Sequence, residues 1–135
     1  MFLVDSNVLL DILSDDATWR PWSESCLRDA LLEGEVGINP IIYAETSVGF
    51  RAPETLDAEL DAFDVTRLGL PYEAAFPAGR AFRRYRRAGG ARSAPLPDFY
   101  IGAHAEVAGL TVLTRDVSRF RTYFPSVRLI SPTEH

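Results

Sequence analysis

Short apolar runs alternate with longer segments of helical spacing along the whole chain, and this alternation limits the possible folds more than any other feature. The runs expected to form buried strands lie at residues 2–4, 36–38, 111–114 and 127–130, with a possible further strand at 65–68. Strands separated by helices build a parallel sheet, because a crossover helix returns the chain to the same end of the sheet. We therefore predict an α/β fold, a three-layer αβα sandwich with a central, mostly parallel sheet.

Proline, asparagine and glycine mark the expected helix boundaries. Asn39 and Pro40 indicate a helix start, since asparagine caps the free amides and proline suits the first helical position. Gly34 and Gly109 are placed to end helices. Helices are expected after residue 5, from 21 to about 33, from 40, and over 53–63, 71–88 and 97–108, with a loop at 91–96. No repeat or linker divides the 135 residues, so residues 1–135 are expected to form a single domain.

The basic residues are unevenly distributed. All fourteen are arginine, and the net charge of the chain is −5. Six arginines fall between residues 80 and 92 without an intervening acid, so the rest of the chain carries −11. The low overall charge, which by itself argues against a nucleic-acid binder, therefore conceals a strongly basic segment.

The missing lysine excludes several function classes. A phosphate-binding P-loop requires lysine, and receiver domains and haloacid-dehalogenase-type phosphatases also use one. Those phosphatases also require a second aspartate at the position where this chain has Asn7. The single cysteine, Cys26, cannot form an internal disulfide and is expected to be a buried apolar residue. The apolar runs are too short for a membrane span, and no signal peptide is indicated, so a cytoplasmic protein is expected.

Four acidic residues are predicted to meet at one edge of the sheet. Asp5 directly follows the first strand, and Asp116 follows the strand at 111–114 by two residues. Glu45 lies on the helix after the second strand, and Asp98 lies in the first turn of its helix. Each of these segments leaves the edge at which parallel sheets form their functional sites, beyond the carboxyl ends of the strands.

Each acid taken alone has a structural interpretation, as a helix cap, an early-turn acid or a turn residue. Glu45 is the hardest to explain in this way, because glutamate on an apolar helix face is rarely buried unless it is paired. Together, four carboxylates repel one another unless a cation joins them. Oxygen ligands without histidine or cysteine favour Mg²⁺ or Mn²⁺ over Zn²⁺. The pattern predicts metal-assisted hydrolysis of a phosphodiester.

Five segments, taken in order, resemble a known family. They are FLVDSNVLL at residues 2–10, NPIIYAE at 39–45, LPDFYIGAHA at 96–105, LTRD at 113–116 and RFRTYFP at 119–125. The chain resembles PIN-domain proteins, and specifically the VapC-type toxins of bacterial toxin–antitoxin pairs. The ensemble spans nearly the whole chain. One departure is Phe99-Tyr100, where members often have a pair such as Ala-Leu, and this is expected to alter the wall of the pocket.

The resemblance implies an activity, a cofactor and partners. It implies a Mg²⁺- or Mn²⁺-dependent endoribonuclease, the toxin of a type II toxin–antitoxin pair, with an RNA substrate, a VapB-like antitoxin and a homodimer. The implied catalytic residues are Asp5, Glu45, Asp98, Asp116 and Thr114. The four acids are the implied metal ligands, Asp5 and Asp98 the most direct, while Asp116 is expected to act through water. The alternative is a catalytically idle PIN module that binds its antitoxin and operator DNA. Such a module would not need all four acids.

Other residues have competing interpretations. The arginine run is a substrate-binding patch, an antitoxin contact or a solvated helix face, and the RNA-binding candidates are Arg84, Arg87, Arg92 and Arg115. Arg115 is alternatively the partner of a nearby acid. His104 is expected to be structural, since it is rotated away from Asp98 on the same helix. Trp19 and Trp22 form either the edge of the core or a groove for the antitoxin.

Overall fold

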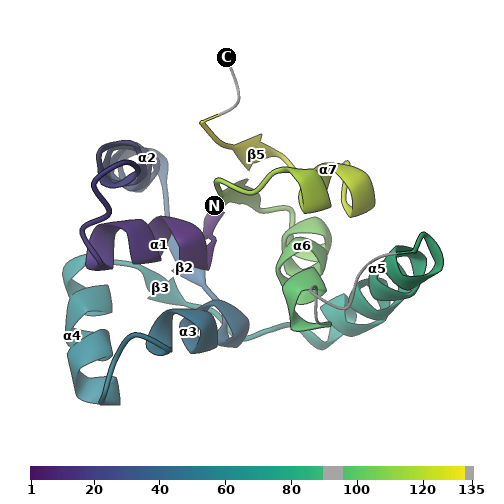
Figure 1. Cartoon of the computed structure of the whole chain (residues 1–135), viewed down its shortest axis with the longest axis horizontal. Coiled ribbons are helices and arrows are strands. Elements are labelled where there is room, and N and C mark those ends of the chain that lie inside the picture. Colours follow the sequence, from purple (N-terminus) through teal and green to yellow (C-terminus); the bar gives the residue numbers. More distant parts are fainter. Residues whose placement is uncertain (90–95, 133–135) are drawn as a thin grey trace.

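The computed structural model describes residues 1–89 and 96–132, and these form a five-stranded sheet with helices around it (Figure 1). All strand pairs are parallel, and the strand order is β3-β2-β1-β4-β5. The strands are β1 (Phe2–Val4), β2 (Val36–Ile38), β3 (Thr66–Arg67), β4 (Thr111–Leu113) and β5 (Leu129–Ile130). The predicted α/β sandwich with a parallel sheet is confirmed.

The helices form two groups, α1–α4 to the left and α5–α7 to the right in Figure 1, and α3 packs against α6 between them. Helix α1 packs on α2 and α3, while α5 packs on α6. The helices are α1 (Ser6–Leu13), α2 (Arg20–Glu33), α3 (Pro40–Ser47), α4 (Pro53–Ala62), the 3₁₀ turn η1 (Tyr72–Ala74), α5 (Ala75–Arg87), α6 (Pro97–Ala108) and α7 (Ser118–Tyr123). No helix among the described residues is long and apolar enough to cross a membrane.

Strand β1 lies at the centre of the sheet and of the main core. Its Leu3 and Val4 are fully buried and pair with Val112 and Leu113 of β4. The chain leaves β1 for β2 on one side, and β4 returns to the other side. The direction of winding therefore reverses between β1 and β4, and binding sites of parallel sheets form outside the strand ends at such a point.

Several predicted helix ends are confirmed. The Asn39 side chain accepts a hydrogen bond from the Ile42 amide at 2.9 Å and so caps α3. Gly109 ends α6 in the left-handed conformation, at a φ of 67°. Such a conformation suits glycine, which lacks the Cβ atom that strains other residues there.

The structure differs from the prediction in several segments. Residues 71–88 form no continuous helix, because Pro77 lacks the amide that would bond back to Glu73; α5 starts at Ala75, and η1 precedes it. The strands expected at 65–68 and 127–130 have only two residues each, Thr66–Arg67 and Leu129–Ile130. Helix α7 was not predicted, since six residues are too few to show a helical period. Most of the loop expected at 91–96, with Arg92, lies outside the described residues.

Candidate active site

A cavity of about 150 Å³ opens at the carboxyl edge of the sheet, where β1 and β4 end. All four acids predicted to meet there line it. They come from four elements or their flanking turns: the end of β1, helix α3, the first turn of α6, and the turn between β4 and α7. The full lining comprises Asp5, Ser6, Asn7, Glu45, Asp98, Ile101, Asp116, Arg119 and Phe120.

Asp5 is the most buried of the four acids, at 8% exposure. Its Oδ1 accepts a hydrogen bond from the Ser6 amide at 2.8 Å, and its Oδ2 accepts one from the Thr114 hydroxyl at 2.8 Å. Burial nevertheless raises the pKa of this carboxyl above its ordinary value, and the nearby Asp116 adds to the rise. The site thus holds Asp5 in one orientation while disfavouring its negative charge.

Thr114, the one neutral residue predicted for the site, joins the ends of β1 and β4. Its buried hydroxyl donates to Asp5 and accepts a hydrogen bond from the Asp116 amide at 3.0 Å. The Asn7 side-chain amide lies 3.3 Å from both Thr114 Oγ1 and Asp5 Oδ2. Because these contacts span more than one hundred residues of sequence, they tie the turn that carries Asp116 to the end of β1.

Glu45 faces the cavity from α3, although part of its side chain is buried. Its Oε1 accepts a hydrogen bond from the Ser6 hydroxyl at 2.9 Å. Burial, followed by the charges of Asp5 and Asp98, raises the pKa of Glu45 to about 7, against an ordinary value of 4.5. A glutamate on an otherwise apolar helix face is therefore explained by the site.

Arg119 is a cavity residue that the sequence did not single out. Its Nη1 lies 3.7 Å from Asp98 Oδ2, and its guanidinium stacks over the Phe99 ring at 5.5 Å from the centroid. Phe99 is fully buried, and neither Phe99 nor Tyr100 lines the cavity. The Phe99-Tyr100 pair therefore does not alter the cavity wall as expected, and Phe99 instead packs against Arg119. Finding Arg119 from sequence would have required helix α7, whose first turn sets it beside Asp98.

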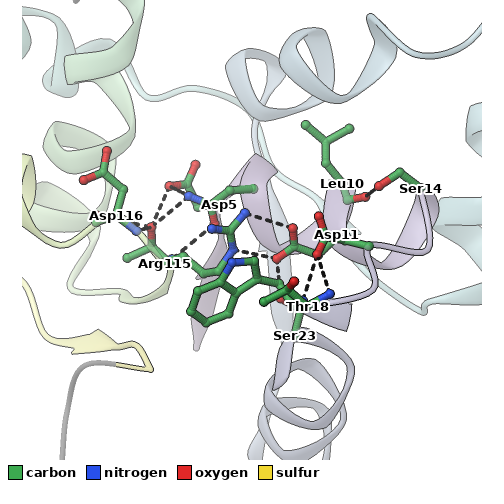
Figure 2. A network of polar contacts seen from close by, with 12 residues as sticks. Asp5, Leu10, Asp11, Ser14, Thr18, Ser23, Arg115 and Asp116 are labelled. Atoms are coloured by element: carbon green, nitrogen blue, oxygen red, sulfur yellow. Dashed lines mark hydrogen bonds and ion pairs between the residues drawn. The ribbon is translucent and has the colours of Figure 1, made fainter. Parts of the chain in front are cut away.

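Arg115 does not line the cavity. Of its two predicted roles, RNA binding and pairing with a nearby acid, the structure shows the ion pair. Its Nε and Nη2 donate to the two carboxylate oxygens of Asp11 at 2.7 and 2.9 Å. Figure 2 shows the guanidinium turned toward Asp11, while the Asp116 side chain points to the other side. Asp11 is buried and also accepts a hydrogen bond from Ser23 at 2.7 Å. The RNA contact predicted for Arg115 therefore lacks support from this geometry.

The pair between Asp11 and Arg115 also fixes the backbone next to the site. The Arg115 amide donates to the Asn7 side-chain oxygen at 3.2 Å, and the guanidinium stacks over the Trp19 ring at 4.8 Å. Trp19 therefore covers this pair, while Trp22 is partly buried and packs against the main core. Asp11 was not predicted as a site residue because it lies off the apolar side of α1 that Val8, Leu9 and Ile12 form, where an acid is ordinarily exposed.

His104 and Cys26 have the structural roles expected of them. His104 is buried, and its Nδ1 accepts a hydrogen bond from the Asn39 side chain at 3.0 Å. Burial lowers the pKa of His104, which favours the neutral ring that this bond requires. Cys26 is buried in the core, and its pKa is raised to about 11 by that burial.

The donor set suits an oxygen-preferring cation. Four carboxylates surround one small cavity, and burial together with their mutual repulsion raises the pKa values of Asp5 and Glu45. Within the described part of the chain, however, no three acidic, histidine or cysteine side chains converge as a ready-made metal site. The chemistry of the four carboxylates nevertheless fits Mg²⁺ or Mn²⁺, which prefer oxygen ligands.

The PIN domain family model matches residues 2–124. This match covers most of the chain, so the chain belongs to the PIN-domain family, whose members are generally nucleases. The family resemblance noted from the five sequence segments is confirmed. No curated protein gives a significant match.

Several solved structures share the fold over nearly their whole length. VapBC-1 from nontypeable Haemophilus influenzae superposes with a TM-score of 0.72 at 17% identity, covering 96% of each chain. FitAcB from Neisseria gonorrhoeae gives 0.69 at 23% identity and full coverage of both chains. VapBC2 from Rickettsia felis, bound to a promoter DNA fragment, gives 0.68 at 18% identity, covering 96% of this chain and 97% of that chain. At these identities the likeness establishes the fold.

Proposed function

We propose that this chain, as a single domain over residues 1–135, is a Mg²⁺- or Mn²⁺-dependent endoribonuclease and the cytoplasmic toxin of a type II toxin–antitoxin pair. The observation that carries the proposal is the gathering of Asp5, Glu45, Asp98 and Asp116 around one cavity. Four carboxylates from separate elements oppose one another unless a cation balances them. Membership of a family whose members are generally nucleases supports the same reaction class.

The four acids have distinct roles in this proposal. Asp5 and Asp98 are the direct metal ligands, Asp116 contributes through water, and Glu45 completes the acidic ring. When bound, the cation supplies Lewis acidity toward the phosphodiester and makes water a better nucleophile. Thr114 holds Asp5 in place through its hydroxyl. Without a cation the pKa of Glu45 is about 7, and a bound cation would favour its ionised form.

One of the proposed partners follows from the structural neighbours. Those neighbours are toxin–antitoxin complexes, and one of them holds promoter DNA. These neighbours support a VapB-like antitoxin as a partner of this chain. The RNA substrate and the homodimer are proposed from the family resemblance. The idle module that only binds antitoxin and operator DNA gains no support from the site, since such a module has no need of four acids on one cavity.

Cleavage of RNA by the purified full-length chain tests the proposal. We expect Mg²⁺ or Mn²⁺ to support internal cleavage, and chelation with EDTA to stop it. Asp5→Asn should remove cleavage and relieve growth arrest on expression. The control is Glu59→Gln, which neutralises an exposed acid on α4 and should leave cleavage unchanged. Equal cleavage by Asp5→Asn and wild type would contradict the mechanism.

A further inference from the structure

Helix α5 presents a basic face to solvent. At 100° per residue, Arg80, Arg83 and Arg87 share the side opposite the buried Ala78 and Ala81, and Arg84 lies at its edge. We call Arg80, Arg83, Arg84 and Arg87 the basic face. All four side chains are exposed. Among the described residues, no acid lies within ion-pair distance of any of them. Their charge is therefore available to a partner.

Exposed aromatic rings accompany these arginines. Tyr72 is 93% exposed and Phe76 73% exposed, and both lie at the start of the same helical segment. The Arg80 guanidinium stacks over the Phe76 ring at 5.2 Å from its centroid. A surface that alternates guanidinium groups with open rings suits single-stranded nucleic acid, whose phosphates bind arginine and whose bases stack on aromatic side chains.

A chain of ring contacts connects the basic face to the acidic cavity. Arg84 stacks over Tyr123 of α7 at 5.3 Å. The Tyr123 ring lies 5.5 Å from the Phe99 ring, and Arg119 stacks over the same Phe99 ring at 5.5 Å. Arg119 lines the cavity beside Asp98, so Tyr123 and the buried Phe99 pack between an arginine of the basic face and an arginine of the cavity.

We propose that single-stranded RNA crosses this surface, with its backbone on Arg87 and Arg84 and on Arg119 at the cavity. The inference rests on the proposed function and adds the route by which the substrate reaches the four acids. A net charge of −5 makes such a route necessary, because the acidic remainder of the chain repels RNA. The exposed rings beside the charges, and the packing of Arg84 and Arg119 on one aromatic cluster, favour RNA over an acidic protein segment.

Binding of a labelled single-stranded RNA over a series of salt concentrations tests the proposal. Every variant carries Asp5→Asn, so that the RNA is not consumed and binding is measured apart from cleavage. The test variant is the double substitution Arg84→Ala and Arg87→Ala. The matched control is Arg28→Ala with Arg51→Ala, which removes the same charge from exposed arginines on α2 and beyond α3.

We expect the test variant to bind RNA about tenfold more weakly and to lower the slope of log K against log salt by roughly 1.4, as loss of two phosphate contacts requires. The control variant should show smaller changes in both RNA affinity and salt slope. Arg87→Ala alone, which disturbs no ring contact, should lower the slope by about 0.7. Thermal unfolding of each variant shows whether it is folded.

Two outcomes would overturn the inference. One is an unchanged salt slope in the folded Arg84→Ala and Arg87→Ala variant. The other is unaltered RNA binding with loss of antitoxin binding, which would assign the basic face to a protein partner. Neither outcome bears on whether the four acids cleave RNA, which the Asp5→Asn and EDTA experiment decides separately.

Discussion

Asp5 and Asp98, the two acids proposed to hold the cation most directly, are fixed in very different ways on the two sides of the cavity. Asp5 belongs to a network that includes Thr114 and Asn7 and extends to the buried pair of Asp11 and Arg115 (Figure 2). Asp98 has one ion-pair partner, Arg119, at 3.7 Å, and its side chain remains 20% exposed. Several hydrogen bonds hold Asp5, whereas Asp98 has this long ion pair and a contact with Glu45 that raises the Glu45 pKa.

The difference shows how such a site combines precision with access. Groups that orient reacting atoms work best when neighbouring hydrogen bonds hold them in place before the substrate arrives. Groups next to an entering substrate must exchange their partners, and a weak, partly exposed ion pair is easily exchanged. We therefore infer that Asp5 and its neighbours orient the reacting groups. Asp98 and Arg119 would give up their ion pair when RNA binds.

The largest expected effect is on cleavage, where the two sides should behave alike. Asp98→Asn should lower cleavage by about a thousandfold, as Asp5→Asn should, because each removes one proposed metal ligand.

The stabilities of these two variants should differ. Burial raises the pKa of Asp5, so its charge costs stability above its ordinary pKa, and Asp5→Asn should unfold at a higher temperature than wild type at pH 8.

Asp98→Asn should shift the thermal midpoint little, since it loses only a partly exposed ion pair. Cleavage rates and thermal midpoints measured on the same preparations check both statements. A higher midpoint for Asp98→Asn, with none for Asp5→Asn, would reverse the comparison.

The second effect is on stability, and it compares Arg115 with Arg119. Arg115→Ala leaves Asp11 buried without its bidentate partner, and should lower the free energy of unfolding by about 2–4 kcal/mol. Arg119→Ala removes the same kind of side chain from a longer, more exposed pair, and should cost about 0–1 kcal/mol. Urea unfolding of the two variants measures this difference. Equal losses would show that the two sides are held equally firmly.

The smallest expected effect is a dependence on pH. In the folded chain the pKa of Glu45 is about 7, against 4.5 ordinarily, so folding takes up a proton between these values. Stability should therefore fall as pH rises from about 4.5 to 7, and level off above. Glu45→Gln should weaken this decline and unfold a few degrees higher than wild type at pH 8.

Mg²⁺ offers a check on the same group. The cation should raise the midpoint of the wild type more at pH 8 than at pH 5, because it binds the ionised carboxylates. Glu59→Gln, an exposed acid on α4, should keep the pH dependence of the wild type. A pH profile of Glu45→Gln that coincides with the wild type would remove Glu45 as the source of the decline.

Much of the candidate site was visible in the sequence because it depends on local rules. Asp5 and Asp116 each follow a buried apolar strand, and parallel strands end at the same edge. Glu45 was conspicuous as an acid on an apolar helix. The residues that escaped prediction, Asp11 and Arg119, have no such local mark, since their roles come from partners 104 and 21 positions away.

By itself, the sequence determined the alternation of strands and helices, most helix ends and the four acids at one sheet edge, because periodicity, capping and strand polarity act over short distances. Only the tertiary structure decided which arginine reaches the cavity. Arg115 turns to a buried aspartate, where an unpaired charge would be costly, and Arg119 takes the place beside Asp98. That choice depends on which side chains the fold buries together, and burial is a property of the packed chain.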